Sequence, residues 1–570
     1  MSYEVFDSDV LVVGAGGAGG RAAIEASNYN VQVCLLTKDL LGKAHTVMAE
    51  GGINAALGNL DPKDDWMSHG QDTCRAGAYL NNQHLVEILV KSAPDRIFDL
   101  ENFGAVFSRT PDGLIMQRPF GHQTYRRTCY AGDRTGHEVM STLVEEIRRR
   151  DIAVYDEVFV TSLLKDGERV AGVTAIDVKS GDFRVYRGKA TIVAAGGAGK
   201  IYEVTTNAQA DVGSGYAWAY KAGAELIDME HFQFHPTSMA FPEAMKGRLV
   251  TEGVRGEGGI LLNKDGERFM KRYNPRLMEL AGRDQVARAI VTEVREGRGA
   301  EHDGVYLDLS FIPSRMIEER LSTMLTDWLD VGVDIREEPM EVTPSAHHAM
   351  GGIRINTECE TNLKGLFVAG EVAGGVHGGN RVGGNALAGI NVFGAIAGES
   401  AAKFALGNDL PSLSREEIEK ERKRVFAPME KNDGIKQVKI RRRLTKLMWD
   451  KVGIFRNEKD LQAALQEINK MQGKDVPELY VEGKFTRYNI EWISTLEVSD
   501  MLLVSEMIAR AALMRRESRG ANYRVDYPKP DNKNWFKNIV IKREGNTMEL
   551  TVVPVVVTLW KPPWMEEKKS

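Results

Sequence analysis

The sequence has 570 residues, of which 43% are hydrophobic and 27% charged, a composition typical of a soluble globular protein with about two to four domains. The net charge of −6 argues against a nucleic-acid-binding protein, and no apolar run reaches the ~20 residues that a membrane helix needs. The cysteines form no C-x-x-C pair, so we expect no metal or iron–sulfur site in this chain and a reducing compartment. They are Cys34, Cys74, Cys129 and Cys359.

The N-terminal stretch DVLVVGAGGAG predicts a strand, a tight glycine turn and a helix. Val10–Val13 suits a strand buried on both faces, and the helix-compatible run Ala18–Ser27 follows. Between them, Gly14 makes the turn, Gly16 lets a pyrophosphate approach the backbone, and Gly19 lets helix and strand pack closely. The helix N-terminus then faces the phosphates, so the motif predicts nucleotide binding; a glycine turn without a ligand is the alternative. Because this strand starts so near Met1, we expect no signal peptide.

The next strand, Val31–Leu36, ends at Thr37-Lys38-Asp39, where no ribose-binding carboxylate is clearly placed. This argues against a plain NAD domain. Helical stretches are predicted at Asn82–Leu100 and Gly136–Arg150, and Val154–Val193 is typical of β-hairpins. The turns are expected at three glycines: Gly167, Gly181 and Gly188.

A second buried-strand run, Ala190–Ala195, also ends in glycines. Residues 236–344 then change character, because they carry more charge and contain short helices at Asp284–Gly297 and Pro313–Val331. This change predicts an inserted domain.

The segment Gly365–Glu371 returns to the pattern of a strand followed by glycine, and a helix is predicted from about Gly389 to Leu406. A helical region begins at Pro411 and has a basic face between Lys436 and Lys446. The last fifty residues predict loops and a small sheet.

Short motifs recur along nearly the whole chain in an order that resembles the flavoprotein subunit of succinate dehydrogenase and fumarate reductase. They are VVGAGGAG (12–19), HTVMAEGG (45–52), QRPFG (117–121), DRTGH (133–137), QFHPT (233–237), LVTEGVRGEGG (249–259), LNKDGERFM (262–270), AGRD (281–284), AMGGI (349–353), LFVAGE (366–371), HGGNRVGGNAL (377–387) and SRGANYRVDYP (518–528).

The resemblance implies an α/β fold with a two-part Rossmann-like FAD-binding domain and an inserted α+β capping domain. A helical domain and a small C-terminal domain would follow. The expected boundaries are 1–235 and 345–410 for the FAD-binding domain, 236–344 for the capping domain, 411–515 for the helical domain and 516–570 for the C-terminal domain.

The family reaction moves a hydride between flavin and a C4 dicarboxylate, succinate or fumarate, and a dianion needs cations or hydrogen-bond donors at both ends. By resemblance, His235, Thr251, His347 and Arg381 form this substrate cage. Taken singly, each residue has a structural interpretation: a strand end, a turn, a buried histidine or a surface charge. The assignment depends on their recurrence in several ordered motifs.

Arg283 aligns with the proton donor and acceptor of the family, with Glu252 and Arg255 as the relay behind it. Arginine holds its proton with a pKa above ~12, so a free arginine would be a poor acid. A guanidinium held beside a developing carbanion and a carboxylate need share its proton only transiently. The alternative, that Arg283 is one more cation for the substrate, stays open at this point.

His45 aligns with the histidine that many members link covalently to FAD, and its flanks favour attachment over an uncommitted histidine. The resemblance therefore implies FAD as cofactor, bound covalently through His45. The expected cofactor contacts are Gly14, Ala15, Gly16, Gly17, Ala18, Gly19, Thr37, Lys38, His45, Thr46, Glu50, Gly51, Gly52, Glu371, Asn385, Ala386 and Leu387.

Four residues depart from the usual family pattern. Glu50 stands where many succinate dehydrogenases have Gln and some fumarate reductases have Glu. This slightly favours fumarate reduction over succinate oxidation as the direction of the reaction. Ser214 replaces an aspartate that contacts FAD, which puts one cofactor contact in doubt. His348 stands in a usual Tyr position and Ala386 replaces a usual Ser near the flavin, so the flavin potential cannot be taken from the family.

Three alternatives remain. L-Aspartate oxidase shares the fold and much of the cage but normally lacks the flavin-linking histidine, so His45 argues against it. Another possibility is a thiol-linked fumarate reductase subunit, which takes electrons from cofactor thiols through partner subunits and which the sequence does not exclude. An FAD-dependent, RNA-binding tRNA-modifying protein would need a basic RNA face, and the acidic total charge favours a solvated helix face or a subunit contact instead. The basic residues are Lys436, Lys439, Arg441, Arg442, Arg443 and Lys446.

The sequence supplies no onward carrier for electrons. The resemblance therefore implies a partner that is an iron–sulfur subunit, with membrane anchor subunits beyond it and no nucleic acid. The expected location is the cytoplasmic side of the cell membrane, in a peripheral position within a complex.

Overall fold

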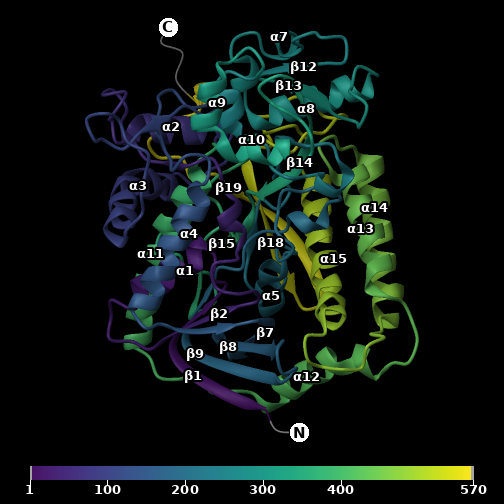
Figure 1. The fold of residues 1–570 in the computed structure, drawn as a ribbon. Helices are drawn as coiled ribbons and strands as arrows, with labels where there is room; N and C mark the ends of the chain where they lie inside the picture. The colour runs from purple at the N-terminus through teal and green to yellow at the C-terminus, as the bar shows by residue number, and fades with distance from the viewer. Residues whose placement is uncertain (1–2, 566–570) are drawn as a thin grey trace.

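The computed structural model describes residues 3–565. Their largest sheet lies in the lower part of Figure 1 and has the order β6-β2-β1-β9-β8-β7, with β16 beside β9. β1, β2, β6, β9 and β16 run parallel, as buried apolar strands joined by crossovers do, whereas β7, β8 and β9 form an antiparallel meander. The strands are β1 (Glu4–Val13), β2 (Val33–Thr37), β6 (Ala153–Asp156), β7 (Val158–Asp166), β8 (Arg169–Asp177), β9 (Phe183–Val193) and β16 (Leu366–Val368).

Helices cover this sheet on the side shown at the left of Figure 1. α1 and α11 approach closely because glycines face α1: a Cβ at Gly394 would lie 2.7 Å from the Ala18 oxygen, and one at Gly398 would lie 2.3 Å from the Ala22 oxygen. The helices on this side are α1 (Gly17–Ala26), α2 (Trp66–Ala76), α3 (Gln83–Phe103), α4 (Thr135–Arg149) and α11 (Asn385–Leu406). α5 (Ser214–Ala222) lies nearer the middle of the molecule, against β7. A small sheet beside them contains β3 (Ile53–Asn54), β4 (Gln117–Arg118) and β5 (Thr128–Cys129).

The inserted segment lies at the top of Figure 1 and has its own core, built from residues between Met239 and Val342. Its sheet has the order β11-β14-β13-β12, and the predicted boundaries at 236 and 344 fall inside the long strands β11 and β14. The exact boundaries therefore stay predictions. The elements are β11 (Phe232–Met239), α6 (Glu252–Gly256), β12 (Ile260–Leu262), α7 (Met270–Tyr273), α8 (Arg283–Arg295), β13 (Val305–Asp308), α9 (Ser314–Arg320), α10 (Ser322–Leu329) and β14 (Met340–Ala349).

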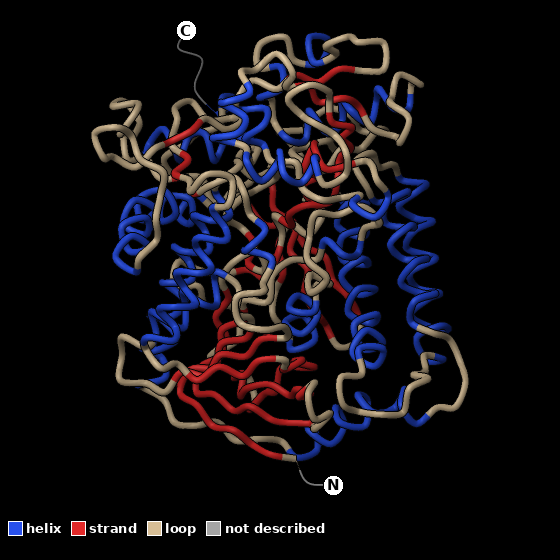
Figure 2. Tube along the Cα trace, in the orientation of Figure 1, coloured by secondary structure: helices blue, strands red, loops and turns tan. Residues whose placement is uncertain are grey.

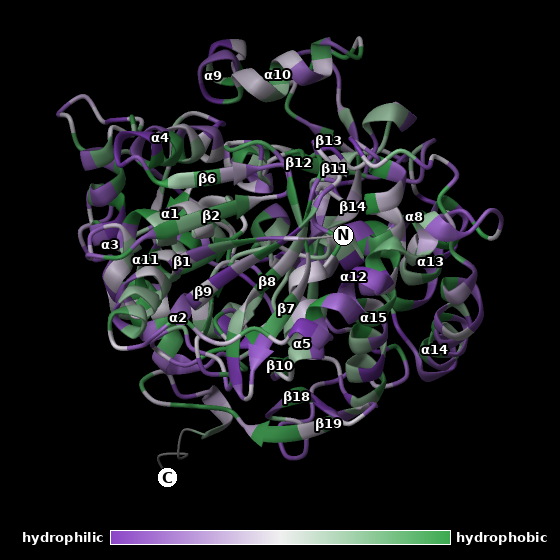
Figure 3. Cartoon of the chain, turned by 90° about the horizontal axis from the view of Figure 1, so that it is seen from below, coloured by the Kyte–Doolittle hydropathy of each residue, from purple (hydrophilic) through white to green (hydrophobic). Residues whose placement is uncertain are grey.

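Long helices form the right side of the molecule (Figures 1 and 2). A C-terminal hairpin of β18 and β19 lies between these helices and the left side. α12, at the lower surface, is mostly hydrophilic (Figure 3). The hairpin extends a sheet in the order β17-β15-β10-β18-β19. The elements are α12 (Arg415–Glu430), α13 (Gln437–Val452), α14 (Glu458–Lys470), α15 (Ile490–Met514), β10 (Leu226–Ile227), β15 (Gly352–Arg354), β17 (Ala373–Gly374), β18 (Lys537–Glu544) and β19 (Thr547–Pro554).

Three local predictions were wrong. Gly188 lies inside β9 rather than in a turn, because the strand continues to pair with β1 at that residue. α11 begins at Asn385, four residues before the predicted Gly389, since the left-handed Gly384 (φ 87°) places its N-cap there. The predicted helix Pro313–Val331 is two helices, interrupted at the buried Leu321 with non-helical backbone (φ −132°, ψ 34°).

Among residues 3–565, no helix combines the length and the apolar character needed to cross a membrane. In the same part of the chain, no histidine, cysteine and carboxylate side chains gather into a group that could hold a metal ion.

Candidate active site

A cavity of about 990 Å³ runs from the glycine turn before α1 to the residues of the inserted segment. At its first end, Gly14 adopts φ +106°, and a Cβ there would lie 2.3 Å from the Ala194 oxygen. A Cβ at Gly19 would lie 1.7 Å from the Gly14 oxygen, so the predicted close packing of helix on strand is confirmed. Gly16 is the N-cap of α1, the Gly17 amide donates to Thr46 Oγ1 over 3.1 Å, and the positive end of the helix dipole borders the cavity.

Most of the expected cofactor contacts line this one cavity. Asn385 does not: it is fully buried, and its side chain bonds to Asn54, His69 and Thr73. Gly19 lies beneath the turn, away from the cavity wall. The lining residues from the predicted set are Gly14, Ala15, Gly16, Gly17, Ala18, Thr37, Lys38, His45, Thr46, Glu50, Gly51, Gly52, Glu371, Ala386 and Leu387.

His45 begins a short 3₁₀ helix at the cavity wall and is enclosed by the loop before α5. Its Nε2 lies 3.2 Å from Asn207 Nδ2, and its Nδ1 lies 3.3 Å from the Ala208 amide and 3.8 Å from Asp211 Oδ2. The ring is therefore held in place while it remains partly exposed, with 26% of the side chain accessible.

The cavity offers polar atoms that a large, polar cofactor can satisfy. Several buried side-chain atoms on its wall have no hydrogen-bond partner within residues 3–565, an arrangement that costs free energy unless a ligand completes it. Together with the helix N-terminus and the glycine turn at the cavity wall, these atoms fit a dinucleotide such as FAD. They are Glu50 Oε2, Asp211 Oδ2, Ser214 Oγ, His348 Nε2, His377 Nδ1 and Arg381 Nε.

At the other end of the cavity, two guanidiniums converge on one amide. Arg283 Nη1 and Arg381 Nη2 donate to Gln233 Oε1 over 3.0 and 3.1 Å, and Gln233 Nε2 donates to Asn380 Oδ1 over 2.6 Å. Arg381 forms no ion pair with any described residue. Its burial, together with the charge of Arg283, lowers the pKa of Arg381 to about 9. Arg381 therefore lacks a carboxylate partner among the described residues, and a bound anion could supply it.

Two histidines complete this cluster, and their rings lie 5.0 Å apart between centroids. His235 Nδ1 lies 2.7 Å from the Thr237 oxygen, and His347 Nδ1 lies 2.8 Å from Thr206 Oγ1. Burial, and then neighbouring groups of like charge, hold the pKa of both imidazoles well below the usual value, so both are neutral at physiological pH. Thr251 caps α6 beside them. The structure thus brings His235, Thr251, Arg283, His347 and Arg381, hereafter the cage, to one end of the cavity.

Glu252 accepts hydrogen bonds from Arg283 Nε and Nη2 over 2.8 and 2.7 Å, and from the Gly121 amide over 2.8 Å. Burial alone would raise the pKa of Glu252, but Arg283 and Arg255 hold it well below the usual value. Arg255 makes no hydrogen bond to Glu252; its Nη1 donates to the Glu279 backbone oxygen over 2.6 Å. Of the predicted relay residues, Arg283 and Glu252 are thus joined by hydrogen bonds, whereas Arg255 interacts with Glu252 only through its charge.

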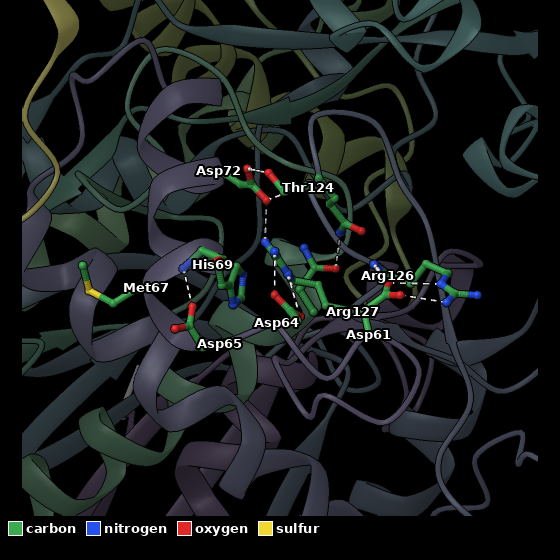
Figure 4. A network of polar contacts seen from close by, with 12 residues as sticks. Asp61, Asp64, Asp65, Met67, His69, Asp72, Thr124, Arg126 and Arg127 are labelled. Carbon is green, nitrogen blue, oxygen red and sulfur yellow. Dashed lines mark hydrogen bonds and ion pairs between the residues drawn. The ribbon is translucent and has the colours of Figure 1, made fainter.

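A buried ion network positions the segment that carries Gly121 (Figure 4). Arg127 is fully buried and pairs with Asp64 and Asp72 over 2.8 Å each. Asp72 also accepts from the amide and the hydroxyl of Thr124, over 2.7 Å each. Residues 117–128 are thereby tied to α2, next to the cage.

Some site residues were not singled out from the sequence. Gln233 lies in the motif QFHPT and could have been found from it, whereas Thr206 and Asp211 belong to no quoted motif. His377 was inside a motif but received no role. Thr206, Asp211 and His377 become recognisable only from the folded cavity, which they line.

The basic face of α13 is largely neutralised within the chain. Four of its six basic residues form ion pairs, with partners from α14, α15 and neighbouring loops or, for one, from α13 itself. The pairs are Lys436–Glu482, Arg441–Glu497, Arg443–Glu467 and Lys446–Asp450.

The fold and the cavity define an FAD-dependent oxidoreductase. Residues 9–387 match the FAD binding domain family, and residues 441–568 match the family described as fumarate reductase flavoprotein C-term. The chain belongs to the flavoprotein subunits of succinate dehydrogenases and fumarate reductases.

Relatives match over almost their whole length. The chain is 51% identical to a subunit of the fumarate reductase (CoM/CoB) of Methanothermobacter marburgensis, over 95% of this chain and 98% of that protein. It is 37% identical to the mitochondrial succinate dehydrogenase [ubiquinone] flavoprotein subunit of Oryza sativa subsp. japonica, over 97% and 91%. Among solved structures, a variant of E. coli quinol fumarate reductase FrdA is 35% identical and superposes with a TM-score of 0.93, over 98% of both chains.

Proposed function

We propose that this chain interconverts fumarate and succinate in the cage, with FAD bound in the remainder of the cavity. The charge of the cage supports this most directly. Its two guanidiniums, Arg283 and Arg381, are both buried, and of the two only Arg283 forms an ion pair with a described residue, Glu252. One carboxylate of a C4 dicarboxylate would pair with Arg381, and the remaining hydrogen-bond donors of the cage suit the other.

In the proposed reaction, bound FAD supplies or accepts the hydride. Arg381 clamps one carboxylate of the substrate. The neutral imidazole of His347, with Nδ1 toward the Thr206 hydroxyl, can donate a hydrogen bond from Nε2, while His235 lines the cage. Arg283 holds the proton that is delivered to the neighbouring carbon, with Glu252 fixing its guanidinium through two hydrogen bonds. Arg255 adds positive charge behind Glu252.

The test is dye-linked turnover by the purified chain loaded with FAD. We expect fumarate reduction with a reduced viologen dye and succinate oxidation with an oxidised dye, but no oxidation of L-aspartate. Aspartate oxidation without fumarate reduction would favour the aspartate oxidase alternative and contradict this proposal.

Covalent attachment of FAD at His45 is part of the proposal, because the ring is held at the cavity wall by Asn207 and Ala208. Denatured wild-type protein should fluoresce on a gel, and His45→Ser should abolish the fluorescent band while FAD still binds. A dark wild-type band with acid-extractable flavin would remove the covalent bond from the proposal.

The proposed partner is an iron–sulfur subunit that leads to membrane anchor subunits, with this chain peripheral on the cytoplasmic side. Thiols are a second candidate for the electron source. The 51% identical relative favours them, because its name specifies CoM/CoB. Copurification of the complex, followed by assays with thiols and with quinol, separates the two electron sources.

A further inference from the structure

The turn that leads into α5 carries two side chains with unsatisfied acceptors, Asp211 and Ser214. Neither Asp211 Oδ2 nor Ser214 Oγ has a hydrogen-bond partner in the described part of the chain, and both residues line the cavity. Asp211 is only 4% exposed. Ser214 stands where the family usually has an FAD-contacting aspartate. The chain thus lacks a carboxylate at 214 and has, three residues earlier, a carboxylate whose Oδ2 is without a hydrogen-bond partner in the described residues.

The backbone fixes the direction of the Asp211 carboxylate. Its backbone oxygen accepts the Lys200 amide over 3.0 Å, and its side chain accepts the Gly197 amide. A Cβ at Gly196, which adopts φ +75°, would lie 2.6 Å from Asp211 Oδ1, so a glycine is required for this approach. One carboxylate oxygen is therefore held against the end of β9, while Oδ2 remains available to the cavity.

The surroundings favour a hydrogen-bond donor at Oδ2. Burial raises the pKa of Asp211 to about 6, an effect that His45 and Lys38 oppose and Glu371 reinforces. His45 Nδ1 lies 3.8 Å away, too far for a good hydrogen bond. A ligand hydroxyl would satisfy the acceptor and stabilise the ionised carboxylate.

We propose that Asp211 binds a hydroxyl group of the polyol chain of the bound cofactor, in place of the aspartate that the family has at the position of Ser214. The inference rests on the proposed function, because it takes FAD as the occupant of the cavity. It differs from a role in which Asp211 serves only as the ionic partner of His45.

A His45→Ser background makes FAD binding reversible and removes the ionic partner at the same time. In this background, Asp211→Asn should weaken FAD binding by about tenfold or more, as expected when a hydrogen bond to a charged group is lost. Flavin fluorescence quenching measures the dissociation constant. Glu203→Gln, which removes an exposed carboxylate eight residues earlier, is the matched control and should change it by less than about twofold.

The double variant Asp211→Ser, Ser214→Asp tests the exchange of positions directly. It should bind FAD within about threefold of the His45→Ser parent, whereas Asp211→Ser alone should not. Recovery in the double variant also decides the matter if Asp211→Asn fails to fold. Unchanged affinity in a folded Asp211→Asn protein, or a folded double variant without recovery, would overturn the assignment.

The outcomes separate this inference from the proposed function. A wild-type chain that binds no FAD would refute both. FAD binding that ignores Asp211 would refute the inference alone. If wild-type FAD is noncovalent, the bond to His45 falls, but the same titrations still decide the role of Asp211.

Discussion

At the scale of single residues, the cage is notable for a cation without an anion. Arg381 is buried, lies near Arg283 and forms no ion pair with any described residue, and burial with that neighbouring charge lowers its pKa to about 9. A bound dicarboxylate supplies the missing negative charge and must raise this pKa, so proton binding and substrate binding are linked.

Linkage predicts the sign of the pH dependence. Below the free-enzyme pKa of about 9, Arg381 is already charged, so its ionisation should make malonate affinity independent of pH in this range. Above it, the affinity should fall by up to about tenfold per pH unit until the complex also loses the proton. Titration of the flavin spectrum with malonate measures this. Arg381→Gln should bind weakly at all pH values, and an alkaline limb that persists in this variant would contradict the assignment.

Arg283 has two possible roles, which a lysine separates. Arg283→Lys keeps the positive charge but loses the fork that bonds twice to Glu252. If Arg283 transfers the proton, fumarate reduction should fall by about 10²-fold or more, with less than about tenfold change in malonate affinity. Equal losses of turnover and affinity would make Arg283 a binding cation only.

At the scale of elements, the cage depends on a loop tied down by buried charge. Residues 117–128 supply the Gly121 amide to Glu252 and are anchored through Arg127 to Asp64 and Asp72 (Figure 4). Removing one partner from such a network leaves buried charges uncompensated, which costs about 3–5 kcal/mol.

The adjacent arginine provides a matched control for this network. Arg127→Met should lower the free energy of unfolding by about 3–5 kcal/mol and reduce turnover, because Asp64 and Asp72 lose their cation. Arg126→Met breaks the exposed pair with Asp61, in which 46% of the Arg126 side chain is accessible, and an exposed hydrogen bond to the Leu60 oxygen, and should cost about 0–1 kcal/mol. Chemical denaturation measures both variants. Equal effects would show that the buried network does not anchor the loop.

Elements with a local cause were predictable, and those fixed by distant contacts were not. The strand, the turn and the helix around Gly14 could be predicted from the sequence, because the apolar run, the glycines and the helix-forming residues are adjacent in the chain. Gly188 was misread because pairing with β1, about 180 residues away in sequence, keeps it in a strand. Arg127 pairs with residues 55 and 63 positions away, a distance at which no sequence pattern indicates the partner.

At the scale of the whole molecule, the cavity lies where the FAD-binding sheet meets the inserted segment, and α13 to α15 stand beside them (Figure 1). Most of the cage and cofactor residues were predicted from the ordered family motifs, and the fold brings most of these residues to the one cavity. Asp211 was not predicted, because an oxygen without a hydrogen-bond partner can be recognised only in the folded structure.

The chain on its own should connect dicarboxylates only to small artificial carriers. Its cysteines are free, buried and dispersed, so we expect no cluster in this polypeptide to pass electrons onward. Purified protein should react with dyes but not with quinol, and an added iron–sulfur subunit with its anchors should establish quinol activity. Rapid quinol turnover by the iron-free chain would contradict this view of the assembly.

The most direct test of the account is a single anaerobic turnover. The FAD-loaded chain is reduced with one equivalent of dithionite and mixed with fumarate, and flavin absorbance is followed while succinate is quantified. The account predicts rapid reoxidation with one succinate formed per flavin, and loss of this reaction in Arg381→Gln at the same fumarate concentration. Flavin that stays reduced in the wild-type chain, or is reoxidised without succinate, would contradict it.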